Sequence, residues 1–235
     1  MLAKGLLMTV VVFGLLGANG LAASDVRPAI SAKTKQRVFF PNRAAALLYD
    51  QSDNDNGSGI VSANFLDTGL DPYDAEGADD FTVPNGKAWT ITEVYVDGTY
   101  FDGAGSADSF NVTFYKSKNG KVRRAIRSCI NAPYRFDSQF DNGSDYIACK
   151  TKLEAGTYFV SVQANTFFST AGEWGWLTNN TVRQSGSKWR NPGDGFATGC
   201  TNFGSTLKCV PVDEGGDYSF AFYGKERDAS PENSN

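Results

Sequence analysis

Short runs of alternating apolar and polar residues, separated by turn-forming residues, limit what this chain can fold into. In the run FNVTF, the apolar residues Phe110, Val112 and Phe114 fall on one side of an extended strand. The best helix candidate, residues 43–48 (RAAALL), is only six residues long. Because alternation with a period of two is typical of half-buried strands, the sequence predicts an all-β fold.

The remaining strand candidates suggest how these strands are arranged. Residues 89–96, 158–162 and 218–223 are further runs rich in β-branched and aromatic residues. Asn119-Gly120 between two strand candidates is a strong signal for a hairpin. Many short strands without helical stretches predict an antiparallel β-sandwich that is jelly-roll-like.

The first residues are not expected to belong to this fold. Lys4 precedes an apolar run that ends near Gly17, and small residues follow up to Ala22, which is the order of regions in a secretory signal peptide. A transmembrane anchor is the alternative, but the run is shorter than the roughly 20 residues that a span needs. We therefore expect a signal helix outside the fold and a secreted or extracytoplasmic protein. The expected segments are a signal peptide at 1–22, a flexible lead-in at 23–45, one β-sandwich domain at 46–225 and a disordered tail at 226–235.

Charge and composition exclude several functions. Cleavage after Ala22 leaves 21 basic and 26 acidic residues, a net charge of −5, which disfavours general nucleic-acid binding. No membrane span is expected after the signal is cleaved. The chain contains no histidine, so Ser-His-Asp and Cys-His catalytic sites and histidine-containing metal sites cannot form.

Four cysteines in an exported chain predict two disulfides. Three pairings are open from the sequence. We favour the sequential pairing, because it closes short loops: Cys129 with Cys149, and Cys200 with Cys209.

Several stretches of the chain together carry a resemblance to a known class of proteins. LYDQSDNDNG, ADDFTVPNGKAWTITEVYVDG, FNVTFYKSKNG and the late WGW, NPGDGF and YSFAFYG resemble secreted bacterial β-sandwich modules over most of residues 46–225. Such accessory modules occur alone or appended to exported proteases and surface proteins. The resemblance implies a sandwich fold and a non-catalytic role, and it supplies no catalytic residues.

An acidic region between residues 44 and 86 contains nine carboxylates and no lysine or arginine. Asp50, Asp53 and Asp55 lie in an Asp-Asn-rich loop whose hard oxygen ligands suit Ca²⁺. The loop does not follow the EF-hand pattern. The alternative, which we favour, is a solvated polar loop rich in Asx turns.

The opposite bias follows downstream. Six cations fall within twelve residues that contain no acid: Lys116, Lys118, Lys121, Arg123, Arg124 and Arg127. One interpretation is a basic face that binds anionic glycans or the acidic surface of a partner. The other, which we favour, is an edge hairpin whose cations discourage edge-to-edge aggregation, because lysine and arginine are common on hairpins.

Three tryptophans are candidates for ligand binding. Trp174 and Trp176 would share a face of a strand, with Trp189 nearby in sequence, and exposed indoles stack on sugar rings. The alternative is that they line the core, because tryptophan is highly buried on average. We expect at least one of Trp174 and Trp176 to be buried.

Two classes of function remain open from the sequence. The favoured one is a non-catalytic secreted or cell-surface binding module whose ligand is an extracellular glycan or a surface protein. The alternative is a glycoside-acting enzyme with a carboxylate pair. The candidate glutamates for that pair are Glu93, Glu154, Glu173 and Glu214.

Overall fold

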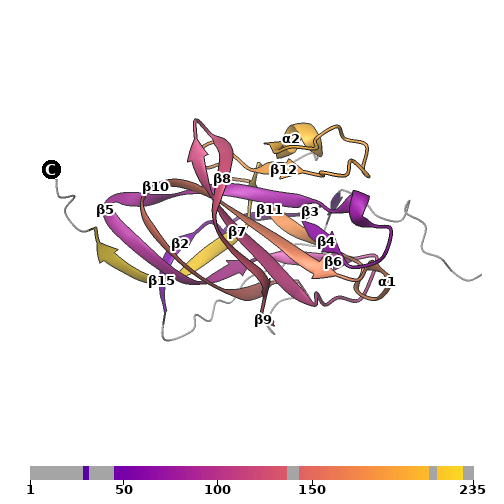
Figure 1. Cartoon of the computed structure of the whole chain (residues 1–235), viewed down its shortest axis with the longest axis horizontal. Helices are drawn as coiled ribbons and strands as arrows, with labels where there is room; N and C mark the ends of the chain where they lie inside the picture. Colours follow the sequence, from indigo (N-terminus) through magenta and orange to yellow (C-terminus); the bar gives the residue numbers. More distant parts are fainter. Residues whose placement is uncertain (1–28, 32–44, 137–142, 212–215, 230–235) are drawn as a thin grey trace, which may run out of the picture.

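The computed structural model describes residues 29–31, 45–136, 143–211 and 216–229, and within them the protein is a two-sheet, all-β structure (Figure 1). The predicted antiparallel, sandwich-like fold is confirmed. The expected signal peptide at 1–22 and most of the expected lead-in lie outside the described residues. Every strand pair in the described residues is antiparallel except β4 with β10.

The described residues form fifteen strands and three short helical segments. The strands are β1 (Ala29–Ser31), β2 (Ala46–Asp50), β3 (Asp55–Val61), β4 (Ala63–Phe65), β5 (Glu76–Val96), β6 (Gly98–Phe101), β7 (Ser109–Lys118), β8 (Lys121–Ala132), β9 (Tyr134–Phe136), β10 (Asp145–Thr166), β11 (Glu173–Asn179), β12 (Lys188–Arg190), β13 (Gly204–Ser205), β14 (Asp217–Tyr218) and β15 (Phe220–Asp228). The helical segments are the 3-10 turn η2 (Asp71–Tyr73) and the helices α1 (Phe168–Ala171) and α2 (Thr206–Cys209).

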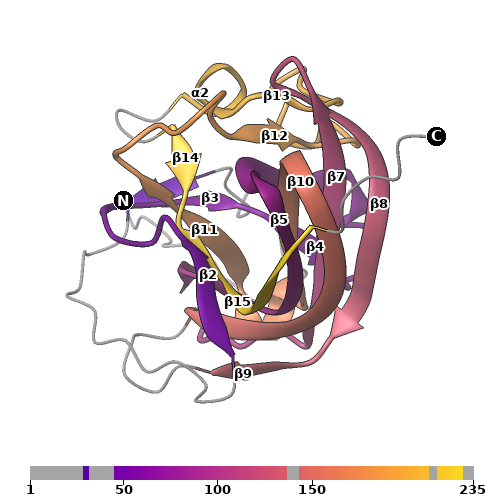
Figure 2. The same ribbon diagram turned by 90° about the vertical axis from the view of Figure 1, so that its left-hand side faces the viewer.

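The larger sheet is built on two very long strands. β5 has 21 residues and β10 has 22, and the two pair along nearly their whole length with two register shifts. The order across the sheet is β13-β12-β5-β10-β7-β8, with β15 also paired to β5. β15 pairs with β5 on one side of the long pair, and β7 and β8 follow β10 on the other side. The sheet curls strongly (Figure 2).

The smaller sheet packs against the concave face of the larger one. Its order is β1-β3-β11-β14, and β6 also pairs with β11. One large apolar core contains residues from both sheets, including Ile60 and Trp176 from the smaller sheet and Phe81, Phe114 and Phe222 from the larger. Phe81 and Phe222 contact edge to face at 4.6 Å, a favoured geometry for aromatic pairs.

Residues between β12 and β13, which are themselves strands of the larger sheet, fold over the face of that sheet that points away from the main core. A second, smaller apolar cluster forms there from Ala78, Tyr115 and Phe159, with Phe203 packed against it. The Phe203 and Tyr115 rings meet edge to face at 5.7 Å. This cover explains why β5 is buried on both faces near Ala78.

Two ordered stretches lie outside the expected domain limits of 46–225. β1 lies within the expected lead-in and pairs with β3. β15 continues through Asp228, where Glu226 pairs with Trp89 and accepts a 3.0 Å hydrogen bond from its indole N–H. Residues 226–228 are therefore part of a strand, because they continue the pairing of β15 with β5 although they lack large apolar side chains.

Candidate binding surface

The three candidate tryptophans are all completely buried. The indole N–H groups of Trp174, Trp176 and Trp189 donate to backbone carbonyls at 2.9, 2.9 and 2.8 Å, and Trp176 stacks on Tyr218 with ring centroids 4.6 Å apart. The hypothesis of a sugar-stacking platform is wrong for this structure, because its rings must be exposed. The expectation that at least one of Trp174 and Trp176 is buried is confirmed. Trp174 and Trp176 do share a face of β11, as the alternation predicts, but that face points into the core between the sheets.

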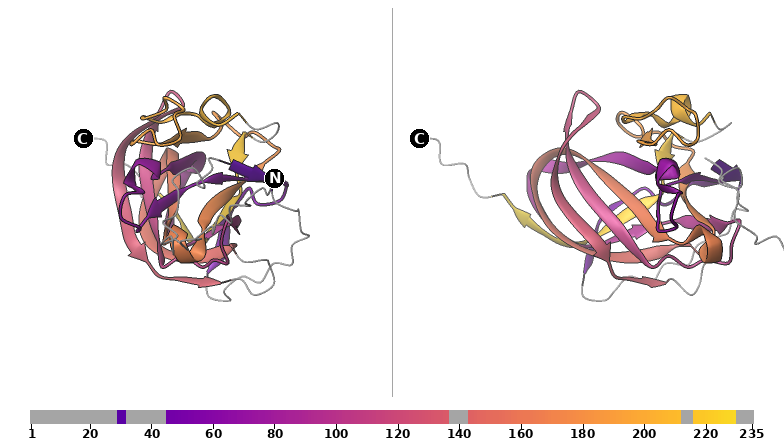
Figure 3. Two further views of the ribbon diagram at one scale, coloured as in Figure 1. Left: turned by 90° about the vertical axis from the view of Figure 1, so that its right-hand side faces the viewer. Right: turned by 45° about the vertical axis from the view of Figure 1, so that its right-hand side comes forward.

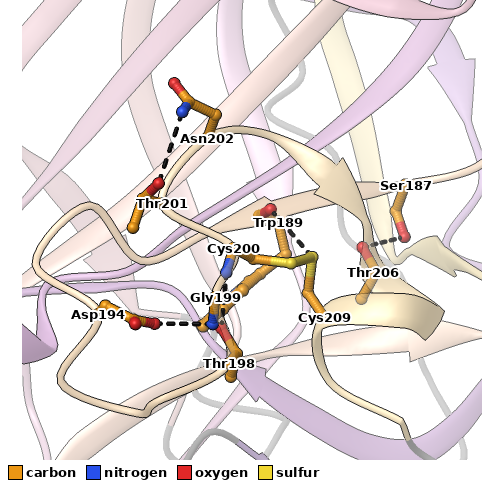
Figure 4. The surroundings of a disulfide bond; sticks show 10 residues. All are labelled: Ser187, Trp189, Asp194, Thr198, Gly199, Cys200, Thr201, Asn202, Thr206 and Cys209. Carbon is orange, nitrogen blue, oxygen red and sulfur yellow. Dashed lines mark hydrogen bonds between the residues drawn. A yellow bond between two sulfur atoms is a disulfide. The ribbon is translucent and has the colours of Figure 1, made fainter.

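The predicted cysteine pairing is confirmed. Cys129 bonds to Cys149 and Cys200 bonds to Cys209. The first disulfide ties the end of the β8 strand to β10. The second closes the segment between β12 and α2, where the Cys209 sulfur also lies 3.7 Å from the Trp189 carbonyl oxygen (Figure 4).

The acidic loop behaves as a polar turn in the described residues. The Asp50 carboxylate accepts hydrogen bonds from the backbone N–H and the hydroxyl of Ser52, and Asp53 forms an ion pair with Arg183 at 2.9 Å. The Asp55 side chain lies outside what the structure describes. The residues that the structure describes contain no group of three metal-ligating side chains. Calcium binding by Asp50, Asp53 and Asp55 stays a prediction.

The glutamates considered for a glycosidase pair lie in separate places. Glu93 accepts hydrogen bonds from Nε and Nη2 of Arg135 at 3.1 and 3.0 Å. Glu154 forms an ion pair with Arg227 at 2.5 Å. Glu154 lies opposite Ala88 on β5, five residues from Glu93, so about 17 Å separates their backbones. Paired catalytic carboxylates lie about 5–10 Å apart. Glu173 is fully buried, and Glu214 lies outside the described residues.

The six cations lie on the β7–β8 hairpin, and all six are exposed. We call this set the cationic hairpin: Lys116, Lys118, Lys121, Arg123, Arg124 and Arg127. Figure 3 shows the hairpin at the side of the larger sheet, with its tip standing clear of the long strands. The Asn119-Gly120 turn at the tip has positive φ at both residues (54° and 65°), as a two-residue hairpin turn of this type requires.

Part of the cationic hairpin forms a row on one face of the sheet. Lys118 lies directly opposite Lys121, so their side chains share a face. Lys116 precedes Lys118 by two residues on β7, so its side chain points to the same face. Arg127 on β8 lies opposite Phe114, which precedes Lys116 by two residues on β7. Neighbouring cations in this row are therefore about 5–8 Å apart at the backbone.

The β8 strand is an edge of the larger sheet. Among the described strands it pairs only with β7, and that pairing has three register shifts. Bulges and lysines on an edge strand are features that prevent another strand from adding to it. This edge is therefore better suited to present charged side chains than to pair its backbone with a partner strand.

No cation of this hairpin is neutralised within the described part of the chain. Lys116 lies 4.6 Å from the centre of the Tyr158 ring, and Arg127 donates to the Lys150 carbonyl at 3.2 Å, but none of the six pairs with a carboxylate. Five cations elsewhere do form ion pairs: Lys87, Arg135, Arg183, Arg190 and Arg227. Other described lysines are unpaired too, but six unpaired cations within twelve residues occur only on this hairpin in the described part of the chain.

A group of buried carboxylates lies near the hairpin tip. Asp79 is completely buried and accepts hydrogen bonds from Gln51 Nε2 at 2.8 Å and from the Tyr218 N–H at 2.6 Å. Asp80 accepts from the backbone N–H and the hydroxyl of Ser185, and Asp217 accepts from the Arg183 N–H at 2.5 Å. We call Asp79, Asp80 and Asp217 the buried carboxylate group.

Burial sets the acid strength of this group. It raises the pKa of Asp217 to about 6, with the negative charge of Asp80 adding to the effect. Burial likewise raises the pKa of Asp80, and it raises that of Asp79 strongly, with further help from the charge of Asp217. Burial lowers the pKa of the nearby Lys188 ammonium, and the negative charges of the three carboxylates partly oppose this lowering. The group can therefore take up protons in mildly acidic conditions.

Asp79 and Asp80 are two of the nine carboxylates between residues 44 and 86, and Asp217 lies far from them in the sequence, so the sequence pattern did not identify this group. The available signal was the run Ala78 to Phe81, in which two adjacent carboxylates interrupt a strand that is apolar at both ends. A carboxylate inside such a strand indicates either an exposed face or a buried polar contact. The partners of Asp79, Gln51 and Tyr218, are distant in sequence, so the choice between the two needed the fold.

Comparisons with protein-family models, curated proteins and solved structures give no match. In the described residues, no helix has the length and apolar character needed to cross a membrane.

Proposed function

We propose that this protein is an exported, non-catalytic binding module that holds an anionic carbohydrate polymer on its cationic hairpin. The observation that carries the proposal is the set of six exposed cations on one hairpin, none of which has a carboxylate partner among the described residues. A row of such cations attracts a ligand with repeated negative charges and raises its association rate.

Other features favour an extracytoplasmic polymer over nucleic acid. The two disulfides are typical of an oxidising compartment, in agreement with the signal-like sequence at the N-terminus. The whole chain carries a formal net charge of −4, so the hairpin acts against an acidic background. An acidic net charge disfavours general nucleic-acid binding, whose affinity depends on many clustered cations.

The test is binding to dextran sulfate, with uncharged dextran as the control ligand. We expect the wild-type protein to bind dextran sulfate only, and the double variant Lys118→Ser/Lys121→Ser to bind at least about tenfold more weakly. Lys152→Ser/Lys225→Ser is the matched control. Lys152 and Lys225 are also exposed and unpaired in the described structure, both lie opposite Thr90 on another part of the sheet, and the net charge changes equally.

Three results would contradict the proposal. One is absence of binding to dextran sulfate. Another is an equal loss of affinity in both double variants, which would show that net charge and not the hairpin governs binding. The third is tighter binding to double-stranded DNA than to dextran sulfate at the same ionic strength, which would identify a different class of ligand.

A further inference from the structure

The tip of the cationic hairpin rests on a loop that is held by the buried carboxylate group. Gly120 lies so close to Ser185 that a Cβ atom on Gly120 would be 2.8 Å from the Ser185 Cβ. Ser185 in turn donates two hydrogen bonds to Asp80, from its hydroxyl and, at 3.2 Å, from its backbone N–H. The hairpin tip and a buried carboxylate are thus separated by a single residue.

The same loop contacts a second carboxylate of the group. The Arg183 N–H donates to Asp217, and the Gly186 N–H donates to the Arg183 carbonyl at 3.3 Å, which closes a turn. One oxygen of Asp80 and one of Asp217 are buried without a hydrogen-bond partner in the described residues. A buried carboxylate oxygen without a donor favours protonation, because the neutral acid costs less to bury than the anion.

We propose that proton uptake by the buried carboxylate group regulates the cationic hairpin, so that the protein binds anionic carbohydrate more tightly in mildly acidic surroundings than at alkaline pH. This inference rests on the proposed function. When these carboxylates are ionised, the negative charge of Asp80 lies one residue below the hairpin tip, and the charges of Asp79 and Asp217 in the same group add to it. These charges oppose the attraction of the hairpin for the ligand. When the carboxylates are protonated, this opposition is removed.

The charged and titratable groups around the carboxylates do not cancel this change. Tyr49 comes from β2 and Tyr218 from β14, and burial raises the pKa of both phenols, so they stay neutral. Arg183 comes from the loop and pairs with Asp53, and Lys188 comes from β12. Both are cations, so proton uptake moves the local charge toward positive.

The size of the effect follows from the distance between charges. Two unit charges about 10 Å apart in water change an equilibrium constant about twofold, and less when salt screens them. Three carboxylates acting on a ligand with several negative charges should together change the dissociation constant about fivefold. Asp217, whose pKa burial raises to about 6, changes its charge between pH 5.5 and pH 8.

The test compares dissociation constants for dextran sulfate at pH 5.5 and pH 8.0 at constant ionic strength. The sulfate groups keep their charge over this range, and the protein has no histidine to titrate. We expect wild type to bind about fivefold more tightly at pH 5.5. We expect Asp80→Asn/Asp217→Asn to bind at pH 8.0 nearly as tightly as wild type does at pH 5.5, with less than a twofold dependence on pH.

Asp74→Asn is the matched control. Burial raises the pKa of Asp74 to about 6 as well, but Asp74 accepts its hydrogen bond from the Phe65 N–H and does not support the loop under the hairpin. This variant should keep the wild-type dependence on pH. If Asp80→Asn/Asp217→Asn fails to fold, the single variant Asp217→Asn should show about half of the wild-type pH effect.

The outcomes separate the two proposals. Binding of wild type with equal affinity at both pH values would overturn the regulation and leave the proposed function standing. An unchanged pH dependence in folded Asp217→Asn would overturn it too. Absence of binding at both pH values would overturn the proposed function itself.

Discussion

Asp217 illustrates how a single buried residue can set the pH dependence of stability. Its folded-state pKa is raised from an ordinary value of 3.8 to about 6. The stabilisation linked to this shift is complete below about pH 4 and is lost as the pH rises through 6, because the folded protein then holds a buried anion.

Replacement of Asp217 by Asn should therefore stabilise the protein at alkaline pH. The amide oxygen can still accept from the Arg183 N–H, while the buried charge is removed. We expect the free energy of unfolding to rise by about 1–2 kcal/mol at pH 8 and to change little at pH 4, since one pKa unit corresponds to ~1.4 kcal/mol. Urea unfolding at the two pH values measures this. Asp108→Asn, at an exposed carboxylate, is the control, and equal effects of both variants at pH 8 would contradict the account.

Trp176 tests the assignment of the tryptophans to the core. Its indole is fully buried, stacks on Tyr218 and donates to the Ser219 carbonyl. We expect Trp176→Ala to lower the free energy of unfolding by about 3–5 kcal/mol, because it leaves a cavity and an unsatisfied carbonyl. Leu177→Ala, at the partly exposed neighbouring position on β11, should cost less. A loss below about 1 kcal/mol in Trp176→Ala would show that the indole lies outside the core.

At the level of elements, a disulfide near one end of the edge strand β8 links it covalently to β10. Cys129 near the end of β8 bonds to Cys149 in β10, across 20 residues of sequence, whereas Cys200 and Cys209 are separated by only 9. In the chain-entropy model the longer loop gives the larger stabilisation. The edge strand that carries the cations is thus held to the long β5–β10 pair.

Removal of this disulfide has a measurable consequence. We expect Cys129→Ser/Cys149→Ser to lower the free energy of unfolding by about 2–4 kcal/mol, and Cys200→Ser/Cys209→Ser to lower it slightly less. Denaturant unfolding without reductant compares the two variants with wild type. If Cys129→Ser/Cys149→Ser unfolded at the wild-type denaturant concentration, the disulfide would not be stabilising the native edge.

Local signals in the sequence were sufficient for some elements and not for others. The Asn119-Gly120 hairpin was predictable because its turn chemistry lies in adjacent residues. The extension of β15 to Asp228 was not, because it depends on pairing with β5 residues about 140 positions earlier. The buried state of Trp174 and Trp176 was one of two alternatives, since alternation shows which residues share a face but not which face another layer covers.

At the scale of the whole molecule, the charge is divided between regions. The stretch from Ala44 to Gly86 carries nine carboxylates and no cation, while residues 116–127 carry six cations and no carboxylate. The sequence showed this asymmetry directly. It did not show that the described acidic residues leave the hairpin unpaired, because ion pairs such as Arg183 with Asp53 join residues 130 positions apart.

The central claim is that ligand binds at the cationic hairpin, and mapping of amide chemical shifts tests it most directly. The measurement is a titration of ¹⁵N-labelled protein with a sulfated dextran oligosaccharide at pH 5.5. We expect the largest shift changes on residues 116–127 and on Ser185, which contacts the hairpin tip. Largest changes on the Lys152 and Lys225 face, or no changes at saturating ligand, would contradict it.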